Sequence, residues 1–190
     1  MLSKTSRLLL VFALFMFVTQ TASAQKKSEA PKMTNAQKIS LAESAGPPEI
    51  SKHAAIVDMA DMKELRAGTN GWVCYAEPNQ PMCLDKEWQK WAEAWMNKTK
   101  PKISGTGIAY MLAGDHGASN TDPYATAPTA DNQWVVAPPH VMILYADHKL
   151  LDAYPTDPKT GGPWVMWKGT PYAHVMVPVS KTKAATMPSK

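Results

Sequence analysis

Apolar residues recur at helical spacing in one segment of the chain. Five of them lie between positions 85 and 97 at intervals of three and four residues: Trp88, Trp91, Ala92, Trp95 and Met96. This spacing predicts an amphipathic helix, because residues three and four apart share a helix face. Asp85 can cap its first turn, and Pro101 prevents much extension. We expect the tryptophans to face the core, although the same stripe would also suit a platform for an aromatic ligand.

Shorter apolar runs, rich in Val, Ile and aromatic residues and split by Pro and Gly, occupy much of the remaining chain. They predict strands at residues 54–59, 64–66, 72–75, 106–112, 134–136, 140–145, 164–168 and 174–179. Thr34 and Gln37 have the spacing of a capping box, which predicts a short helix that stops at Gly46. The pattern therefore predicts a single α+β domain with a mainly antiparallel sheet of about five to seven strands. One amphipathic, tryptophan-rich helix and a short N-terminal helix complete the predicted domain.

Residues 1–24 have the features of an export signal. Lys4 and Arg7 precede an unbroken apolar run over residues 8–18, and small residues at 22–24 form a cleavage site. The run is too short to cross a bilayer as a helix, and no second long one follows. We therefore expect a periplasmic or secreted protein with no transmembrane segment after the signal is cleaved.

The rest of the chain divides into three predicted parts, which are a disordered leader (25–33), the domain (34–180) and a flexible basic tail (181–190). The full sequence has a formal net charge of +4, and the signal holds two of its 20 basic residues and none of its 16 acidic ones. The remaining charge is thus close to balance, and the lysines gather at the ends and in one loop. A nucleic-acid-binding surface needs basic side chains gathered on one face, so we expect no nucleic-acid partner.

Cys74 and Cys83 are the two cysteines of the sequence. An exported chain carries them into an oxidising compartment, where pairing is the default. The turn-rich segment between them contains Pro78, Asn79 and Pro81, which can bring the two ends together. A metal or redox pair would need C-x-x-C spacing or further cysteines. We therefore predict a structural disulfide between Cys74 and Cys83.

Two segments of the sequence resemble each other and contain residues that bind soft metals. Each runs Trp-Val, then Pro, then His-Val-Met, and we expect the two to be neighbouring strands. Alternation along such strands places His140 with Met142, and His174 with Met176, on the same face. Imidazole nitrogen with thioether sulfur suits copper, especially the reduced ion. The alternative is that these side chains simply fill the core, as methionines and strand histidines commonly do.

A polar loop at residues 114–133 follows a predicted strand, and a second long loop covers 146–163. Loops of this length are often functional or mobile. His116 or His140 with Asp115 or Asp122 could act as the acid–base pair of a hydrolase. The same residue types also fold loops through bonds from their side chains to the backbone. No common catalytic or nucleotide-binding motif occurs in the sequence to favour a particular reaction.

Several short stretches carry a resemblance to a family of small exported proteins of Gram-negative bacteria that are themselves uncharacterised. They are Gly68-Thr69-Asn70-Gly71-Trp72 with Cys74, Pro81-Met82-Cys83-Leu84-Asp85, Ala118-Ser119-Asn120-Thr121-Asp122-Pro123, Pro139-His140-Val141-Met142, and residues 167–171 with His174. The resemblance spans most of residues 47–179. It implies a periplasmic or secreted location and a single domain, and it brings no reaction or cofactor with it.

The sequence thus favours a non-catalytic periplasmic protein that binds a small molecule or a metal ion, with copper as the metal candidate. A periplasmic hydrolase using a His/Asp pair and a structural envelope protein are the alternatives. The sequence names no substrate and no oligomeric state.

The predicted export can be tested on protein taken from its native cells. Mass spectrometry should find a chain that begins near Gln25 and lacks free thiols, because the signal is cleaved and the cysteines are paired. Full-length chain with both thiols free inside the cell would contradict export.

Overall fold

The computed structural model describes residues 32–179. The predicted signal (1–24), most of the predicted leader (25–33) and the predicted basic tail (181–190) lie outside the described residues. Residues 33–179 form a single α+β domain built on a mainly antiparallel sheet. Within residues 32–179, no helix has the length and hydropathy required to span a membrane.

The helices and strands follow one another in this order along the chain. They are α1 (Asn35–Glu43), α2 (Pro48–Ser51), β1 (Ala55–Asp58), β2 (Lys63–Arg66), β3 (Val73–Ala76), β4 (Met82–Leu84), α3 (Lys86–Met96), β5 (Gly107–Met111), β6 (Ala118–Ser119), β7 (Trp134–Val135), β8 (His140–Leu144), the 3-10 helices η1 (His148–Ala153) and η2 (Pro158–Thr160), β9 (Trp164–Met166) and β10 (His174–Pro178).

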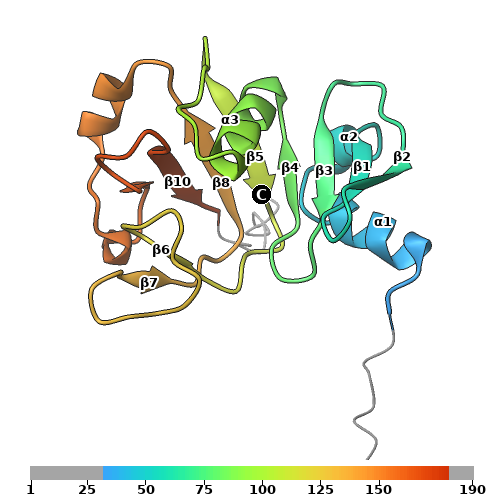
Figure 1. Cartoon of the computed structure of the whole chain (residues 1–190), viewed down its shortest axis with the longest axis horizontal. Coiled ribbons are helices and arrows are strands. Elements are labelled where there is room, and N and C mark those ends of the chain that lie inside the picture. Colours follow the sequence, from blue (N-terminus) through green and yellow to red (C-terminus); the bar gives the residue numbers. More distant parts are fainter. Residues whose placement is uncertain (1–31, 180–190) are drawn as a thin grey trace, which may run out of the picture. The chain divides into compact units, whose positions relative to one another are not determined.

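Eight of the strands form one sheet in the order β2-β1-β3-β4-β5-β8-β10-β9 (Figure 1). All neighbouring pairs are antiparallel except β1 and β3, which are parallel. The short strand β6, inside the long polar loop, pairs separately with β7, which directly follows that loop. The pairing of β8 with β10 confirms that the two similar His-Val-Met segments are neighbouring strands.

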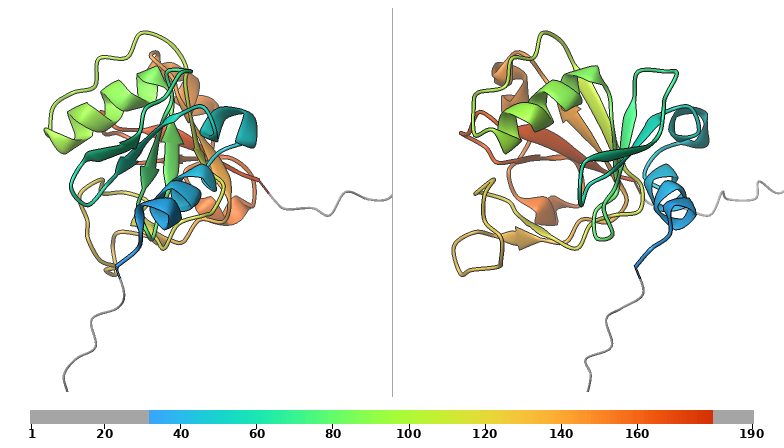
Figure 2. Two further views of the ribbon diagram at one scale, coloured as in Figure 1. Left: turned by 90° about the vertical axis from the view of Figure 1, so that its right-hand side faces the viewer. Right: turned by 45° about the vertical axis from the view of Figure 1, so that its right-hand side comes forward.

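The helices pack on opposite faces of the sheet, and the two views in Figure 2 show α3 and α1 on different sides of it. Alternation along β4 explains the separation, because Leu84 faces α3 while Cys83 faces α1. Trp88 and Trp91 of α3 pack over β5, β8 and β10 in the largest core cluster. A third cluster, around Leu151 of η1, covers the other face of β8, β9 and β10.

Both predicted helix caps are present. Thr34 and Gln37 form the complete capping box of α1. At the start of α3, Asp85 Oδ1 accepts a hydrogen bond of 2.9 Å from the Trp88 backbone N–H. Asp85 Oδ2 accepts a second one of 2.6 Å from the N–H of Ile108 in β5. This carboxylate therefore starts the helix and also fixes it against the sheet.

The structure differs from the sequence prediction in two details of the sheet and loops. The sheet has eight strands rather than five to seven, and β4 was not predicted, because three residues after a proline-rich turn give too short a run to show alternation. The segment 146–163, expected to be free of helices, contains η1 and η2. Asp147 and Asp157 cap these two short helices through their side chains.

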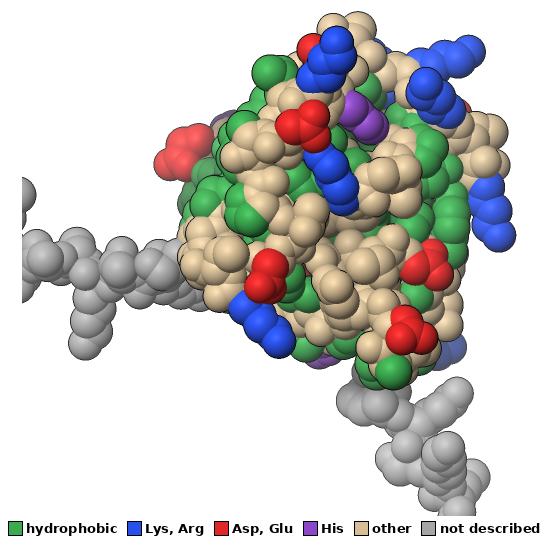
Figure 3. All heavy atoms as spheres, turned by 90° about the vertical axis from the view of Figure 1, so that its left-hand side faces the viewer, with side chains coloured by type: hydrophobic (Ala, Val, Ile, Leu, Met, Phe, Trp, Pro, Cys, Tyr) green, Lys and Arg blue, Asp and Glu red, His purple; other side chains and the backbone are tan. Residues whose placement is uncertain are grey.

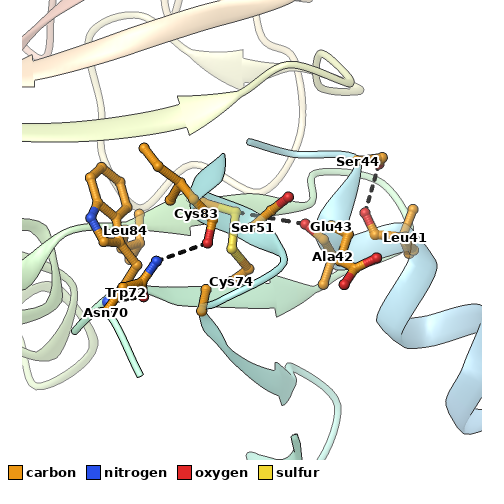
Figure 4. Close-up of a disulfide and its surroundings, with 12 residues drawn as sticks. Leu41, Ala42, Glu43, Ser44, Ser51, Asn70, Trp72, Cys74, Cys83 and Leu84 are labelled. Atoms are coloured by element: carbon orange, nitrogen blue, oxygen red, sulfur yellow. Dashed lines mark hydrogen bonds between the residues drawn. A yellow bond between two sulfur atoms is a disulfide. The ribbon is translucent and has the colours of Figure 1, made fainter. Parts of the chain in front are cut away.

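The predicted disulfide joins β3 and β4, where Cys74 and Cys83 are paired directly across the two strands (Figure 4). Both cysteines are fully buried beneath α1, and Cys83 Sγ lies 3.7 Å from the carbonyl oxygen of Ala42. The bridge therefore links the two strands of the hairpin that leads into α3, and it packs against α1 on the opposite face of the sheet.

Loss of this bridge should lower stability measurably. Replacing both cysteines by alanine should reduce the free energy of unfolding by about 2–3 kcal/mol, because a short loop is no longer closed in the unfolded chain. Urea denaturation of the variant and the parent, each with and without reductant, measures the change. A parent protein whose unfolding midpoint does not move on reduction would contradict this role.

Candidate functional site

A cavity of about 650 Å³ lies between α3, one face of the sheet and the loop of residues 115–126. Its wall on the helix side comes from the tryptophan stripe, and its floor comes from β4, β5, β8, β9 and β10. The volume falls within the usual range for small-molecule sites. The predicted tryptophan helix thus has two roles, because Trp88 and Trp91 are buried in the core and also line this cavity.

The lining is rich in sulfur and aromatic side chains. Seven methionines line the cavity: Met59, Met82, Met96, Met111, Met142, Met166 and Met176. Five tryptophans join them: Trp88, Trp91, Trp95, Trp134 and Trp167. Three histidines, which can bind metals or exchange protons, also line the cavity: His116, His140 and His174. Such a wall is mainly apolar with a few polar atoms, as ligand-binding cavities usually are.

The strand register brings the four predicted metal ligands onto one face. Met142 in β8 lies directly opposite Met176 in β10. His140 and His174 each lie two residues from one of these methionines and therefore point to the same side of the sheet. The two histidines lie on opposite sides of the Met142–Met176 pair. His140 is opposite Pro178, and β10 runs antiparallel to β8.

The register also reveals two methionines that the sequence analysis did not single out. Met111 of β5 lies directly opposite His140, and Met166 of β9 lies directly opposite His174. All six side chains, the two histidines and these four methionines, are buried and line the cavity. The alternation of side chains along a strand could have shown which face of its own strand Met111 or Met166 occupies. The sequence could not show which strands would be neighbours.

Both buried imidazoles use the same backbone interaction. His140 Nδ1 lies 2.7 Å from the carbonyl oxygen of Pro138, and His174 Nδ1 lies 3.0 Å from that of Tyr172. A carbonyl oxygen can only accept, so each Nδ1 carries the proton and donates it. The neutral ring then has a lone pair on Nε2. This is the arrangement that backbone carbonyls impose on metal-binding histidines.

Burial sets the protonation of these groups. It lowers the pKa of His174 to about 4 and lowers the pKa of His140, because a charged imidazole is poorly solvated there. Asp115, whose negative charge acts on His140, has a pKa raised by burial, and hydrogen bonds from the backbone N–H groups of Ala137 and Gly117 oppose this rise. Near pH 7 both imidazoles are therefore neutral.

Aromatic rings surround His174. Its ring centroid lies 5.1 Å from that of Trp167, 5.2 Å from that of Trp88 and 5.7 Å from that of Trp91, all in edge-to-face geometry. Trp91 and Trp167 are parallel to each other within 4°. The structure records no such aromatic pair for His140 among the described residues. The two histidines therefore have different surroundings although they share one backbone interaction.

Unpartnered polar atoms concentrate in this cavity. Within residues 32–179, five buried side-chain nitrogen atoms have no hydrogen-bond partner. Four of them belong to residues that line the cavity: Trp88 Nε1, Trp91 Nε1, His140 Nε2 and His174 Nε2. The indole N–H groups are donors, and the imidazole Nε2 atoms are acceptors. Buried atoms without partners are rare and costly in native proteins, so their gathering at one cavity makes it the candidate site.

The polar loop after β5 is held together by its own side chains. Asn120, almost fully buried, donates to Gln133 Oε1 and to the Thr156 carbonyl, and accepts from Trp164 Nε1. Asn132 donates to the Ala127 carbonyl. These amides are fully engaged in the loop. The described residues contain no group of three or more His, Cys, Asp or Glu side chains that could hold a metal ion.

The three predicted catalytic candidates line the cavity but do not form a relay. Asp115 Oδ1 accepts hydrogen bonds of 2.9 Å from the backbone N–H groups of Gly117 and Ala137. Asp122 Oδ1 accepts from the Tyr124 N–H. Across residues 32–179 the structure contains no hydrogen bond or ion pair between His116 and a carboxylate. Both acids thus shape the loop, and the loop in turn covers the cavity.

The loop is fastened to α3 at one point. Trp95 Nε1 donates to the Pro123 carbonyl over 3.1 Å, and the rings of Trp95 and Tyr124 are stacked with centroids 6.0 Å apart. The Tyr124 hydroxyl donates to that of Tyr172 over 2.8 Å, and Tyr172 in turn donates to the Thr99 carbonyl. These contacts close the cavity between the helix end and the loop.

On the face in Figure 3, Lys and Arg side chains are interspersed with Asp and Glu side chains, and hydrophobic and uncharged groups lie between them. No protein-family model matches this chain, and no curated protein or solved structure is significantly similar to it.

Burial of His174 predicts how stability changes with pH. The unfolded imidazole takes up a proton near its ordinary pKa of 6.5, whereas the folded one stays neutral down to about 4. Between these values the unfolded state binds the extra proton, so stability is complete above pH 6.5 and is lost as the pH falls toward 4. The loss attributable to His174 is about 3 kcal/mol.

Urea denaturation between pH 7 and pH 4, in buffer with a chelator, measures this dependence. The slope of unfolding free energy against pH should be flatter in His174→Gln than in the parent, whatever the absolute stability of the variant. His53→Gln is the matched control, because it makes the same substitution at an exposed position. Equal slopes in the parent and in His174→Gln would contradict the buried neutral imidazole.

Proposed function

We propose that this protein is an exported, non-catalytic binding protein whose ligand occupies the cavity between α3 and the sheet. The observation that carries the proposal is the coincidence of a ligand-sized cavity with four buried, unpartnered nitrogen atoms on its walls. A ligand would satisfy these atoms and fill the space at the same time. The Cys74–Cys83 bridge supports a location in an oxidising compartment, in agreement with the export signal in the sequence.

The cavity wall indicates the general character of the ligand. Methionine and tryptophan provide a wide, adaptable and weakly polar surface, which suits a small and mainly apolar molecule or a soft ion. The two indole N–H groups can donate to such a ligand, and the two imidazole Nε2 atoms can accept from it or bind a metal. A hydrolase is less well supported, since Asp115 and Asp122 accept hydrogen bonds from backbone N–H groups of the loop and of Ala137 rather than from a histidine.

An apolar fluorescent probe tests the cavity directly. N-phenyl-1-naphthylamine should bind, and its emission should rise on excitation of the tryptophans, because five of them line the cavity. Ala92→Phe, which places a ring into the cavity from α3, should weaken binding roughly tenfold or more. Glu93→Phe adds the same ring at an exposed position of the same helix and should bind like the parent. Equal affinity in all three proteins would show that the probe binds elsewhere and would contradict the proposal.

Protein taken from its native compartment provides a second test. Native mass spectrometry should detect a retained molecule or ion, and the Ala92→Phe variant should retain less of it. A parent protein that carries nothing and also fails to bind the probe would sink the binding function.

A further inference from the structure

We infer that the sheet floor of the cavity is a site for a monovalent soft metal ion, Cu(I), held by His140 with the thioethers of Met111, Met142 and Met176. This inference rests on the proposed binding function of the cavity and names the class of ion that it takes. No single strand contains the four side chains. The pairing of β5, β8 and β10 brings them together.

The register places the three methionines around one imidazole. Met111 lies directly across the β5–β8 pair from His140, where paired Cβ atoms are about 4.5–5.5 Å apart. Met142 is two residues along the same strand, and Met176 is directly opposite Met142. Methionine side chains are long and unbranched, so three thioethers at these positions can turn toward one point. The described residues bring no three His, Cys, Asp or Glu side chains together, so this ligand set is built mainly from thioethers.

The imidazole is oriented for coordination by the backbone. Its Nδ1 proton is donated to the Pro138 carbonyl, which leaves the lone pair on Nε2. His140 is completely buried, and its Nε2 has no hydrogen-bond partner within residues 32–179. One nitrogen and three thioether sulfurs form a soft ligand set without a net charge. Such a set favours Cu(I) over hard divalent ions, which prefer carboxylate and carbonyl oxygen.

The surroundings also suit a single positive charge. Asp115 lines the same cavity and is close enough to interact electrostatically with His140. A cation beside the imidazole would therefore have a half-buried carboxylate within reach of its field. His174 lies beyond the Met142–Met176 pair and is packed among Trp88, Trp91 and Trp167. These indoles occupy its surroundings, so His140 is the ligand of the proposed site and His174 is not.

Silver(I) is the probe of choice, because it shares the ligand preference of Cu(I) and needs no reductant that could open the disulfide. Isothermal titration of the purified, oxidised protein with silver nitrate in chloride-free buffer should show one tight site. His140→Gln should weaken binding by roughly tenfold or more. The combined Met111→Leu, Met142→Leu and Met176→Leu variant should do the same, since leucine keeps the side-chain volume and removes the sulfur.

Two matched controls separate this site from general cavity effects. The Met59→Leu and Met96→Leu double variant removes two sulfurs from the same cavity wall but not from the proposed site, and it should bind silver like the parent. His174→Gln should also retain binding. Native mass spectrometry with Cu(I) and ascorbate should then give one copper per chain, with a thiol assay to verify that the disulfide is intact.

The outcomes distinguish this inference from the function on which it rests. Absence of silver binding, loss of binding only in His174→Gln, or equal losses in the two methionine variants would overturn the metal site. If the parent still binds N-phenyl-1-naphthylamine in a manner sensitive to Ala92→Phe, the cavity keeps its binding function without the metal. If the probe also fails to bind, both proposals fall.

Discussion

Burial of one face of β5, β8 and β10 beneath α3 is the constraint on which the rest of the structure depends. The helix covers this face with Trp88 and Trp91, and the strands supply methionines and two histidines. A buried imidazole is tolerated only if it stays neutral and its ring N–H finds an acceptor. Both histidines meet this requirement through the carbonyl two residues earlier in the chain, at Pro138 and Tyr172. The same backbone interaction thus serves both strands, although the residues that provide the carbonyl differ.

The same burial explains why a cavity persists. Large indoles and flexible thioethers meet across the gap between helix and sheet, and the loop held by Asp115, Asn120 and Asp122 closes one side. Trp95 and Tyr124 fasten that loop to the end of α3. The polar loop therefore forms one wall of the cavity, and the two buried histidines lie on the sheet. This division favours binding over catalysis, because the acids that could have served as catalysts hold the loop in shape.

Much of the architecture could be predicted from local pattern. The tryptophan spacing defined α3 and its cap at Asp85, and the compartment implied by the export signal predicted the disulfide. The shared face of His140, Met142, His174 and Met176 was also predicted, because it needs only alternation and the pairing of two similar strands. Met111 and Met166 were missed as partners of the histidines. Their positions depend on register between strands distant in sequence, which no local pattern encodes.

The parallel pairing of β1 with β3 and the existence of β4 were also beyond the sequence pattern. A strand of three residues carries almost no periodic signal, and β4 is defined by its place between β3 and β5. The cavity itself could not be predicted either, since it depends on how side chains from α3, the strands and the long polar loop fill a common volume. Many residues of the site could be predicted from the sequence, but their arrangement around the cavity depends on tertiary packing.

Long-range ¹H–¹⁵N NMR of the histidine rings tests the central claim most directly. In chelator-treated protein at pH 7, His140 and His174 should both show a protonated Nδ1 and an Nε2 that carries no proton. An imidazolium signal, or a proton on Nε2 of either ring, would contradict the account, because the lone pair that the cavity requires would not be there.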